Sequence, residues 1–144
     1  IIIGGIYEKL DDYSKALDYF KKSLKIVLSV YGENHSQVSS IYDHIGEIYF
    51  AQKDYSKALY YFEESLKIRL SLFGENHPEV ALSYYSIGSL YIIQGDKSKA
   101  LNYYEKSLKI RLSVYGENHP LTKEIMDLIN VANSKVLQSP ETTK

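Results

Sequence analysis

The apolar positions of this chain recur at steps of three and four residues. In the stretch that follows Pro78 they are Val80, Tyr84, Ile87, Gly88 and Tyr91. This spacing places side chains on one face of an α-helix, and Gly95 supplies the left-handed stop at its end. The same pattern predicts six further helices, over residues 1–10, 13–30, 36–52, 55–72, 97–114 and 121–136.

The helix over 97–114 begins after a candidate N-cap, Asp96, which can accept a backbone hydrogen bond. Its buried side is predicted to hold Ala100, Leu101, Tyr104, Leu108 and Leu112. The last helix, over 121–136, carries an apolar stripe of Leu121, Ile125, Leu128, Ile129 and Ala132.

One phrase occurs three times at a spacing of 42 residues. Tyr31-Gly32-Glu33-Asn34-His35 returns as Phe73-Gly74-Glu75-Asn76-His77 and as Tyr115-Gly116-Glu117-Asn118-His119. A fixed period of this length indicates a repeat array. Because each phrase falls between two predicted helices, it is interpreted as the connector that ends one helix and caps the next.

Small residues recur in step with the phrase. Gly46 precedes Ala58 by 12 residues, and Gly88 precedes Ala100 by the same distance. A glycine inside a helix costs about 1 kcal/mol relative to alanine. Its recurrence predicts a close approach of two helix backbones, with Tyr91 and Tyr104 to either side.

These residues resemble the tetratricopeptide repeat, in the 42-residue form of kinesin light chains. The resemblance rests on Tyr42-x-x-Ile45-Gly46-x-x-Tyr49 with Ala58 and Phe62, and on Tyr84-x-x-Ile87-Gly88-x-x-Tyr91 with Ala100 and Tyr104. It implies an all-α, right-handed solenoid of antiparallel helix pairs. The array would span 1–137, with repeats at 1–30 (truncated), 36–72 and 78–114, a capping helix at 121–136 and a flexible tail at 138–144.

In this family the first helix of each repeat lines a concave groove. The groove positions implied for the second and third repeats are Asp43, His44, Glu47, Phe50, Tyr85, Ser86, Ser89 and Ile92, and for the first repeat Ile1, Gly5 and Glu8. Kinesin light chain repeats often hold paired asparagines where Asp43-His44 and Tyr85-Ser86 stand here. Their ligands are therefore not implied for this chain.

Composition narrows the possible partners. The net charge of −1 gives no field directed at nucleic acid or an anionic membrane. No apolar run approaches the roughly 20 residues of a membrane-spanning helix. With no cysteine and no signal peptide, a cytoplasmic location is favoured. Since the chain begins without methionine, it is expected to belong to a larger protein.

Four candidate chemistries are weighed against structural roles. The repeated histidines are a layer apart, too distant to share one metal ion, so they are assigned to the connectors. His44 could contact a ligand or be solvated. Ser23, Ser65 and Ser107 lack a repeating base and are read as packing residues. Lys67-Ile68-Arg69 and Lys109-Ile110-Arg111 are assigned to a solvated convex face, with a phosphate-binding stripe as the alternative.

No phosphate loop, metal motif, cofactor motif or catalytic motif is present in the sequence. The function expected is therefore a non-catalytic scaffold that binds a partner peptide or helix in its groove, with Tyr85 as an aromatic anchor. The alternatives are a structural segment that self-associates through exposed array ends, and a regulatory domain of a larger signalling protein.

Overall fold

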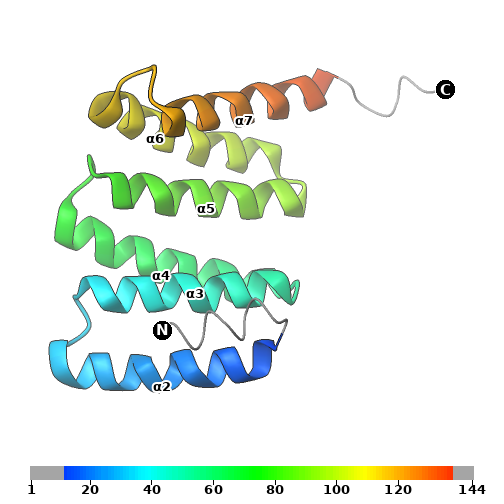
Figure 1. Ribbon diagram of the computed structural model, residues 1–144. Helices are drawn as coiled ribbons and strands as arrows, with labels where there is room; N and C mark the ends of the chain where they lie inside the picture. The colour runs from blue at the N-terminus through cyan, green and yellow to red at the C-terminus, as the bar shows by residue number, and fades with distance from the viewer. Residues whose placement is uncertain (1–11, 138–144) are drawn as a thin grey trace. The chain divides into compact units, whose positions relative to one another are not determined.

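The computed structural model describes residues 12–137, and every element in that range is an α-helix (Figure 1). The helices are α2 (Tyr13–Tyr31), α3 (Ser36–Ala51), α4 (Tyr55–Phe73), α5 (Pro78–Gln94), α6 (Lys97–Tyr115) and α7 (Pro120–Leu137). The predicted helix over 1–10, the groove positions Ile1, Gly5 and Glu8, and the tail over 138–144 lie outside the described residues.

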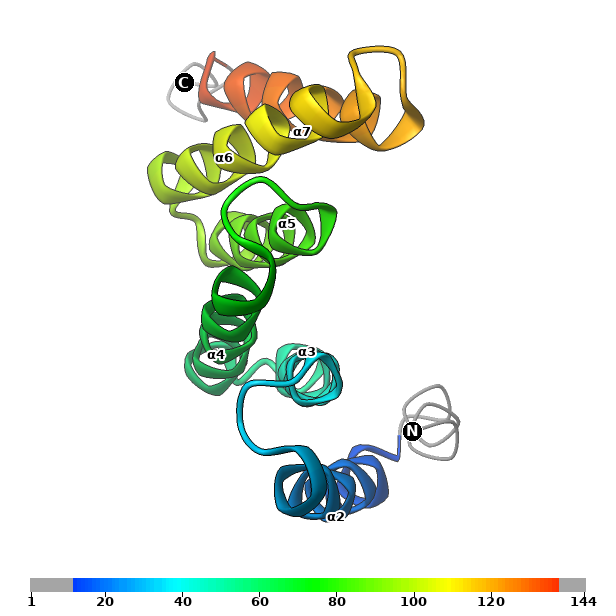
Figure 2. The same cartoon turned by 90° about the vertical axis from the view of Figure 1, so that its left-hand side faces the viewer.

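The chain divides into two compact units between Gly74 and Glu75. In the first unit α3 packs against both α2 and α4, and in the second α6 packs against both α5 and α7. Within each unit, consecutive helices run in opposite directions (Figures 1 and 2). The pairs α3–α4 and α5–α6 have the most extensive contacts, as expected for the two helices of one repeat.

Aspartates begin the second helix of each pair. The Asp54 carboxylate accepts a hydrogen bond from the backbone N–H of Lys57 at 3.3 Å, and Asp96 accepts one from Lys99 at 3.1 Å. These bonds satisfy one of the free N–H groups at a helix start. The N-cap role predicted for Asp96 is confirmed.

The recurring glycines make room for an aromatic ring of the partner helix. A Cβ at Gly46 would lie 2.7 Å from Phe62, and one at Gly88 would lie 2.7 Å from Tyr104. The backbone oxygen of Ala100 is also close, at 3.3 Å from a Cβ at Gly88. The close approach predicted from sequence is therefore present, but its tightest contact is with a ring rather than with the opposite backbone.

The other repeated positions pack around these glycines. Ala58 and Ala100 are fully buried, Tyr49 is nearly so, and Tyr91 is half-buried. The Tyr49 ring stacks on Tyr61 with centroids 5.7 Å apart. At the equivalent place in the second unit, the Tyr91 ring stacks on Tyr103 at 5.8 Å.

One expectation for α6 is wrong. Leu112 is 42% exposed, whereas Ser107, Ile110 and Arg111 are buried. The buried positions of α6 follow the steps 100, 104, 107 and 111, and residue 112 lies about 100° farther round the helix from residue 111. Leu112 was expected to be buried because it is hydrophobic, but the position that faces the core by helical phase is that of Arg111.

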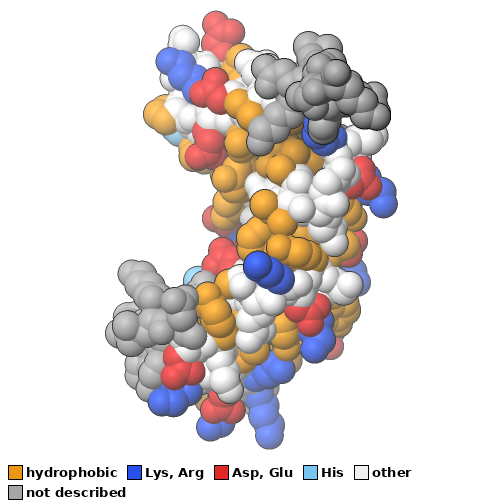
Figure 3. Space-filling view, turned by 90° about the vertical axis from the view of Figure 1, so that its right-hand side faces the viewer, with side chains coloured by type: hydrophobic (Ala, Val, Ile, Leu, Met, Phe, Trp, Pro, Cys, Tyr) orange, Lys and Arg blue, Asp and Glu red, His pale blue; other side chains and the backbone are white. Residues whose placement is uncertain are grey.

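Basic and acidic side chains are interspersed with hydrophobic ones on the face drawn in Figure 3.

Among residues 12–137, none of the helices is both long and apolar enough to traverse a lipid bilayer.

Candidate functional site

The repeated histidines cap the starts of α3, α5 and α7. The Nδ1 atom of His35 accepts a hydrogen bond from the backbone N–H of Gln37, and His77 and His119 accept the equivalent bonds from Glu79 and Leu121, each at 3.1 Å. The rings of Tyr31 and His35 are also stacked, with centroids 4.2 Å apart. The structural role predicted for these histidines is confirmed.

A metal site would need several ligands brought together. Within residues 12–137, no group of three or more His, Asp or Glu side chains could hold a metal ion.

Two of the predicted groove residues of the first unit, Asp43 and His44, are already engaged within the protein. The Asp43 carboxylate lies 2.6 Å from the Arg69 guanidinium, and its side chain is 18% exposed. The His44 ring stacks on Phe20 of α2, with centroids 4.9 Å apart. These two side chains therefore join α3 to α4 and to α2.

The other two predicted groove residues on α3 differ in exposure. Glu47 is more than half exposed, and its carboxylate lies 3.7 Å from Nδ1 of His44. Phe50 is half-buried and meets Tyr55 edge to face, with centroids 5.6 Å apart. Of the four α3 positions, Glu47 is the one most open to a partner.

Buried arginines are the residues that sequence reasoning missed. Arg69 and Arg111 were assigned with their lysine neighbours to a solvated face, yet both are 3% exposed. Arg111 donates to the backbone oxygen of Leu121 at 2.9 Å and pairs with Glu124 at 3.3 Å. Its guanidinium also lies 5.4 Å from the centre of the Tyr85 ring.

The sequence did contain a signal for this burial, namely arginine and not lysine at positions 69 and 111. A planar guanidinium can pair with a carboxylate, a carbonyl and an aromatic face together, whereas an ammonium is a compact point charge that prefers water. The solvated-face assignment holds for exposed Lys67 and Lys109 and is wrong for the arginines.

Burial changes the acidity of Asp43. Removal from water raises the pKa of this carboxyl, while the positive charge of the adjacent Arg69 opposes the rise. Burial of the charged form is unfavourable unless partners compensate for the lost hydration. Asp43 is therefore a packed structural group with a partner.

The predicted groove residues on α5 are all half-buried. The Ser89 hydroxyl lies 2.9 Å from the Tyr104 hydroxyl, and the Tyr85 ring centroid lies 6.2 Å from that of Tyr104. Burial raises the pKa of Tyr104, with the Ser89 hydrogen bond acting in the opposite direction. The Tyr85 ring therefore has the Arg111 guanidinium and the Tyr104 ring as neighbours. Ser86, the next residue in the sequence, is half-buried.

Ile92 lines an open hollow in the second unit, which we call the α5–α7 hollow. Its volume is about 190 Å³, and it is lined by Ile92 of α5, Lys97 and Tyr104 of α6, and Leu128, Val131 and Ala132 of α7. Val131 is 50% exposed there. The lining is mostly apolar, so the hollow suits an apolar side chain.

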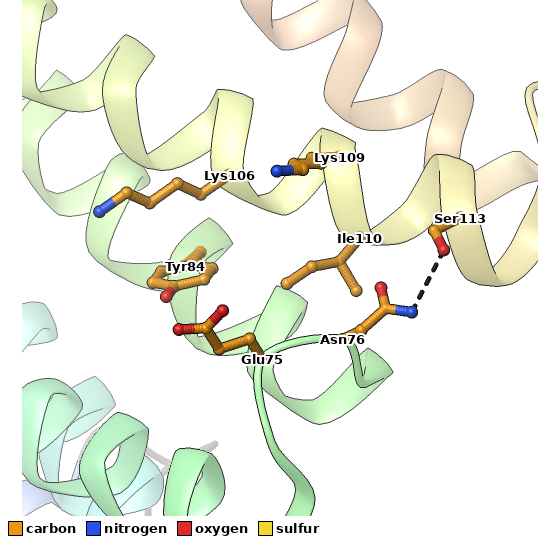
Figure 4. A pocket seen from close by; sticks show the side chains of 7 residues that line it. All are labelled: Glu75, Asn76, Tyr84, Lys106, Lys109, Ile110 and Ser113. Atoms are coloured by element: carbon orange, nitrogen blue, oxygen red, sulfur yellow. Dashed lines mark hydrogen bonds between the residues drawn. The ribbon is translucent and has the colours of Figure 1, made fainter.

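A second hollow, the Lys106–Lys109 cavity, is larger and more polar. Its volume is about 470 Å³, and it is lined by Glu75, Asn76, Tyr84, Lys106, Lys109, Ile110 and Ser113 (Figure 4). On one side, Asn76 donates to the Ser113 hydroxyl at 3.2 Å. None of these residues belongs to the α5–α7 hollow.

Comparison with known proteins identifies the family. The tetratricopeptide repeat family model matches residues 2–71 and 37–113, which together make up most of the chain. The chain belongs to the tetratricopeptide repeat family. The fold class expected from the sequence, an all-α solenoid of helix pairs, is confirmed by this match and by the helices described.

Solved tetratricopeptide repeat structures share the fold at low sequence identity. BtubC (BKLC) from P. vanneervenii matches with a TM-score of 0.76 and 20% identity, over 95% of this chain and 63% of that one. A Podosopora anserina putative kinesin light chain with nearly identical TPR-like repeats matches with a TM-score of 0.80 and 16% identity, over 94% and 66%. At these identities the likeness shows a shared fold.

A third likeness is to the N-terminal domain of stress-induced protein-1 (STI-1) from C. elegans. Its TM-score is 0.60 at 20% identity, and the match covers 87% of each chain. The present chain spans about two thirds of the length of the first two structures. No curated protein matches it significantly. Tetratricopeptide repeats generally mediate protein–protein interactions and are generally non-catalytic scaffolds.

Proposed function

We propose that this chain is a non-catalytic scaffold that binds an extended peptide or helix of a partner protein along α5, with one apolar side chain of the partner in the α5–α7 hollow. The observation that supports this most directly is the apolar lining of that hollow, which includes the half-exposed Val131. Ile92, predicted from sequence as a groove residue, is part of the lining.

The remaining α5 positions would contact the rest of the partner segment. Ser86 and Ser89 are half-buried, as is Tyr85, which Arg111 holds in place from one side. A side chain fixed before binding loses less conformational entropy on association. In the first unit Glu47 and Phe50 would act similarly, while Asp43 and His44 would act by positioning their neighbours.

The proposal can be tested with Val131→Asp. Twelve-residue peptides are first selected from a random display library on the wild-type chain, and their affinities are then measured by fluorescence anisotropy. Burying an aliphatic side chain contributes about 1.5–3 kcal/mol, so a charge at the hollow should weaken binding by about tenfold or more.

Leu112→Asp is the matched control, because Leu112 is an α6 residue that is 42% exposed and does not line the hollow. Its affinity should stay within about twofold of wild type, and both variants should keep wild-type helicity by circular dichroism. Equal losses in the two variants, or no loss in Val131→Asp, would contradict the proposal.

A further inference from the structure

The Lys106–Lys109 cavity differs in charge from its counterpart one repeat earlier. Each lining residue has an equivalent 42 positions before it, and six of the seven pairs have the same residue type. The exception is Lys106, which stands where the earlier repeat has Glu64. The charge of this region therefore becomes more positive in the later repeat through a change at one position.

In the first unit the repeat supplies its own anion. The Lys67 ammonium lies 3.1 Å from the Glu64 carboxylate, one helical turn away. The pair is neutral, and it shows that a carboxylate fits beside a lysine at this phase of the helix. Lys109 is the equivalent of Lys67, and its neighbour Lys106 repels it instead.

In the second unit, the Lys106 ammonium makes cation–π contacts with two tyrosine rings. The Lys106 ammonium lies 5.5 Å from the centre of the Tyr84 ring and 5.3 Å from that of Tyr103. Within residues 12–137, no carboxylate lies at ion-pair distance from Lys106 or Lys109. Two lysines on one face of α6 are thus available to an external anion.

The rest of the lining restricts what kind of anion would fit. Tyr84 and Ile110 provide an apolar surface between the lysines and the connector, where Glu75 lies on the opposite rim (Figure 4). Burial, and then the charge of Glu75, raises the pKa of the Tyr84 hydroxyl, so that it remains a neutral hydrogen-bond donor at pH 7. Negative charge on the connector side directs the anion towards the lysines.

We propose that the Lys106–Lys109 cavity binds an acidic side chain of a partner protein, with the carboxylate between the two lysines and an adjacent apolar side chain over Tyr84 and Ile110. A volume of about 470 Å³ accommodates two peptide residues. The cavity shares no residue with the α5–α7 hollow, so this is a second contact beyond the proposed function.

The probe for this site is the capped dipeptide acetyl-Glu-Leu-amide, titrated into the uniformly ¹⁵N-labelled chain. We expect the amide signals of Tyr84, Lys106 and Lys109 to shift with a dissociation constant in the millimolar range, typical of so small a ligand. Acetyl-Gln-Leu-amide should bind at least about tenfold more weakly, because charge-assisted bonds are about twice as strong as neutral ones.

Two reciprocal variants make the test specific. Lys106→Glu recreates the arrangement of the preceding repeat and should abolish the shifts, whereas Glu64→Lys should produce new shifts at Tyr42 and Lys67. Both substitutions place a residue that the equivalent position already tolerates, so the fold should be kept.

Equal affinity for the Glu and Gln dipeptides, or unchanged shifts in Lys106→Glu, would overturn the proposal. If inorganic phosphate gave the same shifts at equal concentration, the cavity would be a simple anion site and the assignment to a peptide would be wrong. Loss of partner binding in Val131→Asp would leave this titration unaffected.

Discussion

At the scale of single residues, the buried arginines connect positions that the family places in a binding groove to the opposite helix of the pair. Arg69 reaches Asp43 on α3, and Arg111 reaches Tyr85 on α5. The equivalent position in the first repeat is Val27, which cannot make either contact. A residue that belongs to the groove by phase can therefore serve mainly to fix the packing of its own pair.

The Asp43–Arg69 pair should give the folded state a defined pH dependence. Because burial raises the pKa of Asp43 above its value of about 3.9 in unfolded chains, the folded state retains a proton that the unfolded state releases over the interval between the two pKa values. Stability contributed by this group is present below the unfolded pKa and lost as pH rises through the folded pKa.

Urea unfolding of wild type and Asp43→Asn between pH 3 and 7 would measure this effect. The free energy of unfolding of wild type relative to the variant should fall as pH rises through the interval and then become constant. A relative stability that rises over the same range would show that the attraction of Arg69 outweighs the cost of burial.

At the scale of helices, the connectors are closed by their own residues. Gly32, at φ 81°, ends α2, and its N–H donates to the Leu28 carbonyl at 3.0 Å. His35 then begins α3 by accepting from Gln37. The direction of the chain between two helices is thus set within a few residues.

His35→Ala should lower the free energy of unfolding by about 1 kcal/mol, because loss of an N-cap leaves a helix N–H without its acceptor. His35→Asn should recover most of this loss, since asparagine is a good N-cap, although it cannot stack on Tyr31. Thermal unfolding followed by circular dichroism would rank the three proteins. If the Asn variant were as unstable as the Ala variant, the stack rather than the cap would stabilise the connector.

The helices and their ends could be predicted from the sequence because local signals determine them. Asp96, Gly95 and His77 act on backbone groups within a few residues, and periodicity alone identifies which helices are amphipathic. Contacts made across a helix pair carry no such local mark. The ion pair of Arg69 with Asp43, and the cluster of Arg111 with Tyr85 and Glu124, depend on which side chains face each other after packing.

Only part of each candidate site could likewise be predicted from the sequence. Ile92 could be placed by family phase, but the α7 part of its hollow could not, because Val131 is exposed on a helix whose expected role was to cap the array. From the sequence, Lys109 was assigned to a solvated face and Lys106 was not singled out. The two lysines form a candidate site because Tyr84 and Ile110 lie beside them in one cavity.

At the scale of the whole molecule, the two units should respond separately to a local change. Repeat arrays are stabilised by each repeat and by the contacts between neighbours. Gly88→Ala introduces a Cβ at 2.7 Å from Tyr104, a contact too short to keep. Overpacking of this kind costs about 1–3 kcal/mol, against which alanine returns about 1 kcal/mol of helix propensity.

Amide hydrogen exchange would show which helices are destabilised by this substitution. We expect amide exchange in α5 and α6 to accelerate by up to roughly tenfold for each 1.4 kcal/mol lost, with a smaller change in α3. Asn102→Ala, an exposed substitution in the second turn of α6, should leave exchange unchanged or slower. Equal acceleration in α3 and α5 would show that the chain unfolds as one cooperative body.

The self-contained connectors also bear on how such a chain can evolve. Since each connector is shaped by its own glycine and histidine, a tandem duplication of one 42-residue segment adds a unit together with its own connector. A new copy begins identical to its parent and can then diverge one codon at a time. Glutamate and lysine codons differ by a single base, so the contrast between Glu64 and Lys106 is a change that one mutation can make.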